Sequence, residues 1–268
     1  SLALFILAVL YGFQNGLNLF KKQNMEIENI IVDNKEIISK MITQYDGIAN
    51  GTLEIPRRDP TSPSWAIWNS PSYAFKYPSP MMVFSLGQAE QYGFYKKVTN
   101  WSTPFDSDMA EEIANPERLV IGTLDFNFVL IYLLPILIVI LLFNVGGLEK
   151  DLRFEKLIFL NNVSKKNWLL SRFSFYYGLI NILLFSLMFI YAMIAGVFHN
   201  EAHSFFILLF TTSLYMFLWF FIFYFINYFG RQSSDQALKM ISAWLLLCII
   251  IPGAIHQFSS IKYPVNYM

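Results

Sequence analysis

Charged residues and cysteines are both scarce in this sequence of 268 residues. Charged residues make up 14% of the chain and hydrophobic residues 55%, whereas a soluble domain carries about 25% charged residues. The composition therefore excludes an ordinary soluble domain and predicts a membrane protein. The single cysteine, Cys248, excludes a disulfide within the chain. The net charge is zero and no basic tract is present, so we expect no nucleic-acid partner.

Signatures of catalysis and nucleotide binding are also absent. No G-x-x-x-x-G-K-[ST] loop occurs, so the chain does not hydrolyse ATP by that route and any nucleotide energy must come from a partner. No G-x-S-x-G or other nucleophile pattern occurs either. We therefore predict no catalytic residue, no cofactor held by this chain, and no enzyme activity of its own.

Two of the three histidines, His199 and His203, lie four residues apart with Glu201 between them. On one helix this spacing would place both imidazoles on the same face, where they could bind zinc. The order of residues differs from the H-E-x-x-H motif, and a short polar turn between two membrane helices explains the same residues. We predict no metal site here, and a membrane-embedded zinc enzyme is the weakest of three hypotheses.

Ionisable residues are rare inside the apolar runs, where the polar residues are amides and hydroxyls such as Asn181, Thr211 and Asn227. A proton-coupled transporter normally carries carboxylates or a buried basic residue within the membrane. The scarcity of such groups argues against ion-driven transport. It favours an outside energy source or a lipid-like cargo.

Apolar runs predict five membrane helices. The run at residues 1–13 is shorter than the ~20 residues that a span requires, so we expect its start to lie before Ser1. The second span, residues 126–148, contains Pro135, and membrane helices often bend at proline. Helices three to five are expected within residues 173–258, at 175–198, 205–229 and 240–255, and residues 259–268 should begin a second extracytoplasmic segment.

Lysine and arginine indicate the orientation, because they gather in the short loops that face the cytoplasm. Residues 149–172 and 231–239 carry such residues, whereas residues 199–204 carry none. We therefore place the two basic loops in the cytoplasm. It follows that the insertion at residues 14–125 is an extracytoplasmic domain.

The sequence predicts a mostly helical extracytoplasmic domain. Isoleucines spaced by three and four residues predict an amphipathic helix at 26–45 that runs on from the first apolar run and ends at Gly47 or Asn50-Gly51. Six prolines exclude a long helix from residues 56–80. Two shorter helices are expected at residues 81–95 and 106–114.

Residues 149–172 form a basic, amphipathic segment that we expect to lie on the cytoplasmic membrane surface. One interpretation is a simple interfacial anchor. The other is a coupling segment that docks on a cytoplasmic ATPase. For coupling we select the charged residues at its start: Glu149, Asp151, Arg153, Glu155 and Lys156.

Three stretches resemble one known family. The sequence NPERLVIGTLDFNFVLIYLLPILIVILLFNVGGLEKD, residues 115–151, resembles permease subunits of ABC-2 type transporters. PSPMMVFSLGQAEQYGFYKKV, residues 78–98, and YGFQNG, residues 11–16, are similar to a bacterial subfamily with a large extracytoplasmic domain after the first helix. The chain departs from that family in the coupling segment, where Arg153-Phe154-Glu155 replace Gly-Thr-Leu and Asn161-Asn162 replace Gln-Pro.

The resemblance implies an all-α polytopic protein of the bacterial inner membrane, with an ABC-2 bundle in which five of six helices are visible and the first is truncated. It implies a cytoplasmic ABC ATPase that holds ATP and Mg, a second permease copy or a sister subunit, and surrounding membrane lipid. The expected function is a permease subunit of an ATP-driven exporter. Candidate pathway residues are Asn127, Asn181 and Thr211. The alternative is a non-transporting scaffold or sensor that acts through residues 14–125, whose aromatic loop at 65–77 could bind a protein.

Overall fold

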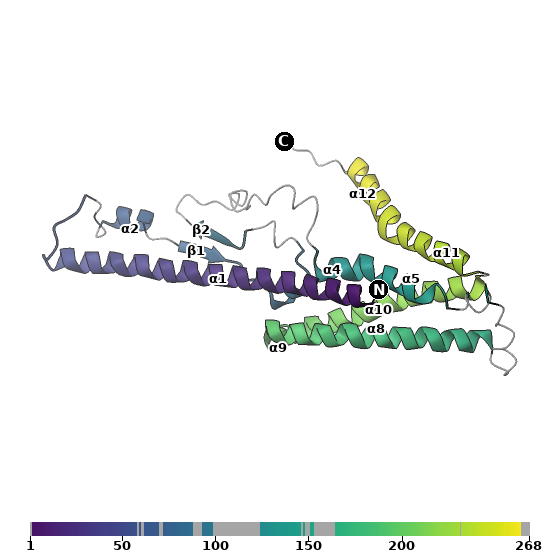
Figure 1. Cartoon of the computed structure of the whole chain (residues 1–268). Coiled ribbons are helices and arrows are strands. Elements are labelled where there is room, and N and C mark those ends of the chain that lie inside the picture. The colour runs from purple at the N-terminus through teal and green to yellow at the C-terminus, as the bar shows by residue number, and fades with distance from the viewer. Residues whose placement is uncertain are drawn as a thin grey trace. The chain divides into compact units, whose positions relative to one another are not determined.

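The computed structural model describes residues 2–57, 59, 62–69, 72–87, 93–98, 124–145, 147, 151–152, 164–230 and 232–263. The chain divides into a bundle unit, Ser1–Phe13 with Leu124–Met268, and an inserted unit, Gln14–Thr123. Helices dominate the described residues (Figure 1). Among these residues, four helices are long and apolar enough to cross a membrane: Leu2–Ala49, Lys165–Ala195, Ala202–Phe229 and Ser233–Lys262.

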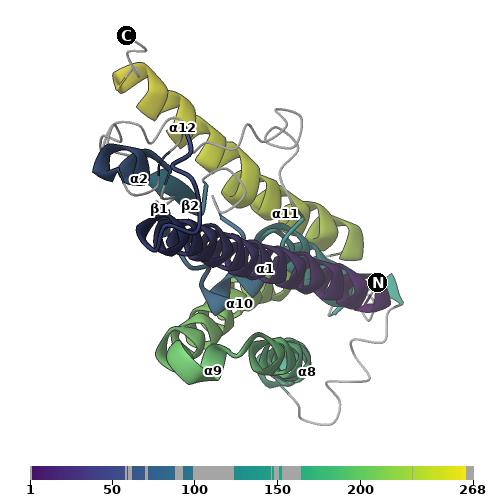
Figure 2. The ribbon, with the colours of Figure 1, turned by 90° about the vertical axis from the view of Figure 1, so that its left-hand side faces the viewer.

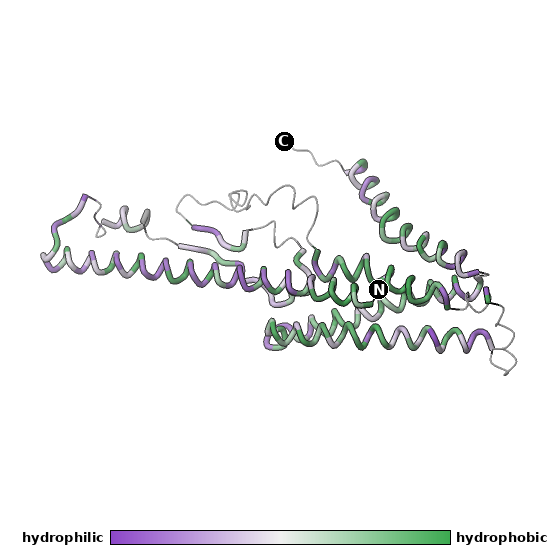
Figure 3. Tube along the Cα trace, in the orientation of Figure 1, coloured by the Kyte–Doolittle hydropathy of each residue, from purple (hydrophilic) through white to green (hydrophobic). Residues whose placement is uncertain are grey.

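Helix α1 (Leu2–Ala49) is a single continuous helix. This continuity confirms the prediction that the amphipathic helix at 26–45 runs on from the first apolar run. Its residues are apolar at the start and mixed further along (Figure 3). The helix ends before Gly51, whose φ of +71° is a left-handed conformation that glycine adopts without a steric penalty.

The start of α1 packs tightly in the bundle unit. Phe5, Val9 and Phe13 recur every four residues and are buried on one face of the helix. The Phe13 ring stacks on Phe126 at 4.4 Å between centroids. A Cβ on Gly12 would lie 2.6 Å from the backbone nitrogen of Phe126, so only glycine permits this approach.

The second apolar run forms one apolar helix, shorter than the four candidate spans, from three consecutive elements: α4 (Phe126–Phe128), the π-helical turn η3 (Val129–Leu133) and α5 (Leu134–Leu142). The Asp125 carboxylate caps its start by accepting a hydrogen bond of 2.7 Å from the Phe128 N–H. The predicted span at 126–148 is too long, because the helix ends at Leu142 and residues 143–145 form a turn.

Helix α8 (Lys165–Ala195) begins ten residues before the predicted start at Phe175. Its buried face already includes Leu169 and Phe173, so the helical packing period starts earlier than the apolar run. The Ser164 side chain caps it by accepting a hydrogen bond from the Asn167 N–H. The last eight residues of the predicted surface segment, Lys165–Arg172, are therefore the start of α8.

Helix α8 is followed by the short helix α9 (Val197–Asn200) and by α10 (Ala202–Phe229). Gly196, with φ of +74°, separates α8 from α9. Helices α8 and α10 pack side by side (Figure 2). The predicted fourth span at 205–229 lies within α10, which ends before Gly230 as expected.

The last span consists of α11 (Ser233–Leu245), the π-helical turn η4 (Leu246–Ile250) and α12 (Ile251–Lys262). The predicted span at 240–255 is too short at both ends, because the polar residues 233–239 join the helix and Pro252 lies inside it. Only Gln236, Met240 and Cys248 are buried, and α12 has no buried residue.

In the inserted unit, the remainder of α1 packs on the 3₁₀ turn η1 (Pro80–Val83), where Gly16 approaches the Val83 backbone. The unit also contains α2 (Pro63–Asn69) and two antiparallel strands, β1 (Ser72–Phe75) and β2 (Tyr95–Val98), with Phe75 opposite Tyr95.

Two predictions for the inserted unit have a clear outcome. The described part of residues 56–80 contains no long helix, as the prolines predicted, since α2 spans only 7 residues. The predicted helix at 81–95 is wrong, because Gly87 has φ of +52° and Tyr95 begins a strand. The predicted helix at 106–114 lies outside the described residues.

Candidate functional site

The bundle unit has a polar end at which the loop after α5 contacts the last span. One carboxylate oxygen of Asp151 accepts hydrogen bonds from the Ser233 hydroxyl, at 2.5 Å, and from the Ser233 N–H, at 3.3 Å. The N-cap residue of α11, Gln232, provides no side-chain cap. Asp151 therefore supplies the cap from 82 residues away in the sequence, and its negative charge complements the positive helix N-terminus.

A cation plays the opposite role at the neighbouring helix end. The Lys165 ammonium, at the start of α8, donates a hydrogen bond of 2.6 Å to the backbone carbonyl of Tyr228 near the end of α10. It also lies 5.1 Å from the centre of the Tyr228 ring. The last carbonyls of a helix lack partners within the helix and carry partial negative charge. Lys165 thus satisfies one of them and joins α8 to α10.

Gln236, in the first turn of α11, is fully buried. Its side-chain nitrogen donates a hydrogen bond of 3.3 Å to the Asn227 carbonyl. A Cβ on Gly230 would clash with Gln236 Cγ, and one on Gly147 would lie 2.7 Å from Gln236 Oε1. Glycine at both positions lets the loop after α5 and the end of α10 approach α11. We call Gly147, Asp151, Asn227, Ser233 and Gln236 the polar cluster.

A second group of contacts surrounds Pro135 in the middle of the bundle unit. Proline has no N–H, so Pro135 cannot bond to the carbonyl of Ile131, four residues before it. The Tyr215 hydroxyl of α10 donates to that carbonyl at 2.8 Å, and the Cys248 thiol contacts it at 3.8 Å. Trp244 Nε1 donates to the adjacent Tyr132 carbonyl at 3.1 Å. We call Ile131, Tyr132, Tyr215, Trp244 and Cys248 the proline node.

The last span repeats the same backbone feature, a π-helical turn followed by a proline. A π-helical turn begins at Val129 and precedes Pro135, and a π-helical turn begins at Leu246 and precedes Pro252, both at an offset of six residues. Such turns and prolines are the ordinary causes of a bend in a helix. Through Cys248 the two turns also contact each other. The bundle unit therefore has two potential bending points beside one another.

Of the five residues selected for coupling, only Asp151 lies among the described residues. Asp151 lies in the polar cluster, where it bonds to α11. Glu149, Arg153, Glu155 and Lys156 lie outside the described residues, so their roles stay predictions. The structure adds a role for Asp151 that the sequence does not reveal, since its carboxylate is bonded to a membrane span of the same chain.

The three candidate pathway residues are not brought together by any interaction among the described residues. Asn127 is exposed on α4. Thr211 is exposed and its hydroxyl donates to the Ile207 carbonyl of its own helix. The Asn181 amide nitrogen donates to the Tyr177 carbonyl, while its oxygen is buried without a partner. A pathway through these residues remains a prediction.

The histidine pair lies on two different helices, because His199 is in α9 and His203 is in α10. Glu201 between them has φ of −129° and ψ of 27°, which interrupts the helix. The geometry of one helix face, on which the zinc hypothesis relied, is therefore absent. Among the described residues no group of three or more potential metal ligands is found.

Sequence reasoning overlooked Gln236 and the three donors of the proline node. The sequence does indicate the acceptor of these hydrogen bonds, since Pro135 has no N–H to donate to the Ile131 carbonyl within the helix. No sequence pattern identifies Tyr215, Trp244 and Cys248 as its partners, because they lie 84 or more residues away.

These features define the class of the protein. The chain is a largely helical, multi-pass membrane protein, with four candidate membrane spans among its described residues. No family model, curated protein or solved structure matches the chain. Any more specific function therefore depends on the sequence resemblance and on the geometry of the bundle unit.

Proposed function

We propose that this chain is the permease subunit of an ATP-driven exporter of the ABC-2 type, located in the bacterial inner membrane and powered by a separate cytoplasmic ATPase. The sequence resemblance at residues 115–151 motivates the proposal. The missing nucleotide-binding loop is consistent with it, because such a subunit relies on a partner that binds ATP and Mg. The partners are the ATPase and a second permease copy or sister subunit.

The observation that carries the proposal is the contact between Asp151 and Ser233. Asp151 lies in the segment that we assign to ATPase docking, and Ser233 begins the last membrane span. A transporter driven from the cytoplasm needs a mechanical link of this kind between its docking segment and a span that can move. A simple interfacial anchor does not require one.

The proposed mechanism follows from this link. ATP binding draws the two ATPases together and displaces the docking segment. Asp151 transmits the displacement to the first turn of α11, and the span bends at the π-helical turn before Pro252. The first proline-bearing span stays fixed, because Tyr215 of α10 donates a hydrogen bond to its Ile131 carbonyl. Alternating access then results from the movement of one span against the others.

The first experiment tests the partner. The full-length protein is co-expressed with the ATPase encoded beside it and purified through a tag on this subunit. We expect a stoichiometric ATPase whose ATP turnover depends on the permease. If no nucleotide-binding protein co-purifies, and none increases ATP turnover in reconstituted membranes, the exporter proposal fails and a scaffold or sensor that acts through Gln14–Thr123 becomes the better explanation.

The second experiment separates docking from transmission. The Glu149→Lys variant should weaken ATPase co-purification, because it reverses a charge on the docking surface. The Asp151→Ala variant should retain the ATPase and lose most of the stimulation of ATP turnover, because the link to α11 is broken. Lys239→Gln is the matched control, since it removes a charge on α11 outside the polar cluster. Equal behaviour of Asp151→Ala and the control would contradict the transmission role.

A further inference from the structure

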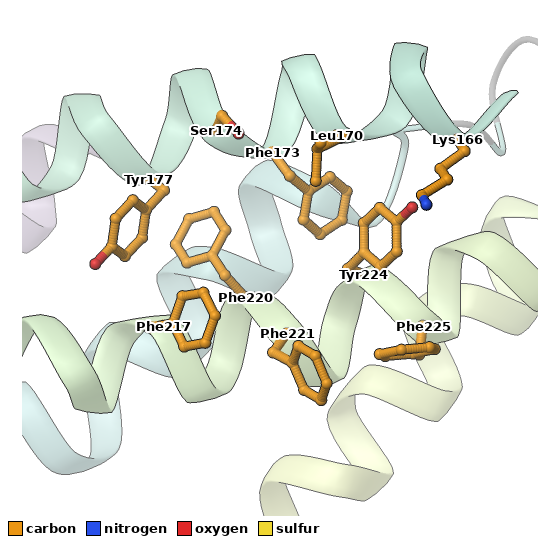
Figure 4. Close-up of a pocket in the computed structure, with 10 residues that line it drawn as sticks. All are labelled: Lys166, Leu170, Phe173, Ser174, Tyr177, Phe217, Phe220, Phe221, Tyr224 and Phe225. Carbon is orange, nitrogen blue, oxygen red and sulfur yellow. The ribbon is translucent and has the colours of Figure 1, made fainter. Parts of the chain in front are cut away.

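An open apolar groove lies between α8 and α10, with a volume of about 440 Å³. Figure 4 shows aromatic rings from both helices along the groove, with Lys166 at one end and Tyr177 at the other. Phe173 and Phe220 form its buried floor, whereas Phe217 and Phe221 are 54% and 53% exposed. An exposed aromatic surface of this kind requires an apolar neighbour.

The two ends of the groove differ in chemistry. Lys166 is exposed and, among the described residues, forms no hydrogen bond or ion pair. The ammonium of its neighbour Lys165 instead donates a hydrogen bond to the Tyr228 carbonyl. At the other end, the Tyr177 hydroxyl lies 2.7 Å from the Ser213 hydroxyl, and this contact joins α8 to α10. The groove therefore has one cationic end and one end at which a hydrogen bond joins the two helices.

The length of the groove limits what can occupy it. Lys166 and Tyr177 are eleven residues apart on α8, which corresponds to about 16 Å of helix at ~1.5 Å per residue. This length matches half of a hydrocarbon core of ~30 Å, which is one leaflet of a bilayer. A transmembrane helix from a second copy would need a groove along the whole α8–α10 pair. An acyl chain of one leaflet needs only this length.

We propose that the groove binds an acyl chain of an anionic phospholipid, with the lipid phosphate at Lys166. The apolar walls match the chain, and the exposed ammonium at the cationic end matches the negative headgroup. This inference concerns the bundle unit alone and does not depend on the ATPase. It assigns to Lys166 a role in lipid selectivity that is separate from the link formed by Asp151.

The test uses the full chain, stripped of lipid in a neutral detergent and examined by native mass spectrometry. Phosphatidylglycerol and phosphatidylcholine with identical acyl chains are titrated separately. We expect one molecule of phosphatidylglycerol to bind in preference to phosphatidylcholine. Lys166→Gln should reduce that preference by about fivefold, the effect of removing one basic residue at a membrane surface. Lys239→Gln, which removes an exposed charge away from the groove, should leave it unchanged.

A second pair of variants tests the apolar walls. Phe221→Ala should weaken binding of both lipids, whereas Phe206→Ala, at a similarly exposed position on α10 (55%), should not. Equal affinity for the two lipids, or equal effects of Lys166→Gln and Lys239→Gln, would overturn the proposal. A disulfide between two copies of a Phe221→Cys variant in native membranes would overturn it as well, because a second copy would then cover the groove. Circular dichroism of each variant checks that the helices are retained.

Discussion

The two proline-bearing spans of the bundle unit share one backbone feature, a π-helical turn before the proline, and differ in the side chains that contact that turn. Each has a π-helical turn six residues before its proline. In the first span, side chains of α10 and α11 donate to the carbonyls of Ile131 and Tyr132. In the last span, no hydrogen bond from a side chain of another helix to a carbonyl of the turn Leu246–Ile250 is found among the described residues. The same sequence feature therefore gives a braced bend in one span and an unbraced bend in the other.

Burial differs in the same direction. Six residues of α5 are buried, including Pro135 itself, whereas none in α12 is buried. A proline frees a carbonyl in either case, and the neighbouring helices decide whether the bend is fixed or free to change. This difference is the reason that we assign movement to the last span and support to the first.

The largest expected effect on stability comes from a glycine substitution beside the first proline-bearing span. Gly12→Ala should destabilise the protein by about 1–3 kcal/mol, because its Cβ would clash with the Phe126 backbone at the start of the braced span. Gly253→Ala is the matched control in the unbraced span, where nothing lies within 4 Å of the added Cβ. It should cost nothing and can gain up to about 1 kcal/mol. Thermal unfolding in detergent measures both, and equal losses would show that the spans are equally packed.

A smaller effect is expected from one hydrogen bond of the proline node. Tyr215→Phe removes the hydroxyl that donates to the Ile131 carbonyl and should cost about 1 kcal/mol, since that carbonyl then keeps only the long 3.8 Å contact from the Cys248 thiol. Tyr263→Phe, at a residue that is 69% exposed after α12, should have no effect. Unfolding by denaturant in mixed micelles gives the difference. If Tyr215→Phe left the free energy of unfolding unchanged, the proline node would not brace the first span.

The smallest effect is expected outside both spans, at the exposed pair of Glu36 and Lys40 on α1. Lys40 lowers the pKa of Glu36 by hydrogen bonding and by its charge, so the contribution of the pair is present at neutral pH and is lost as pH falls through the lowered pKa. Water and salt screen so exposed a pair. Lys40→Gln should leave the melting temperature at pH 7 unchanged within error, and a clear loss would mean that surface contacts brace α1.

The sequence predicts the broad architecture because apolar runs and proline positions are local signals. The positions of α10 and of the end of α1 follow from such signals, through the run that stops at Gly230 and through Gly51. The start of α8 at Lys165 does not, since a buried face begins at Leu169 inside a segment that reads as basic and amphipathic. The helix predicted at 81–95 fails because strand pairing between Phe75 and Tyr95 is a non-local contact.

The candidate site is less predictable for the same reason. Asp151 is identifiable as a charged residue after a membrane span, but its contact with Ser233 joins residues 82 positions apart. Gln236 reads as a loop residue, and only the close approach of Gly147 and Gly230 makes it a buried one. Contacts between distant segments decide both cases, and composition and periodicity carry no information about them.

Hydrogen–deuterium exchange of the full chain in lipid nanodiscs tests most directly whether the first span is fixed and the last one bends. We predict that backbone amides just after Pro252 exchange faster than those just after Pro135, although a π-helical turn precedes each proline at the same offset. The Pro252→Ala variant should slow the faster region, because the restored N–H can bond to the Cys248 carbonyl. Equal exchange after both prolines would contradict the account, since the braced and unbraced bends would then be the same.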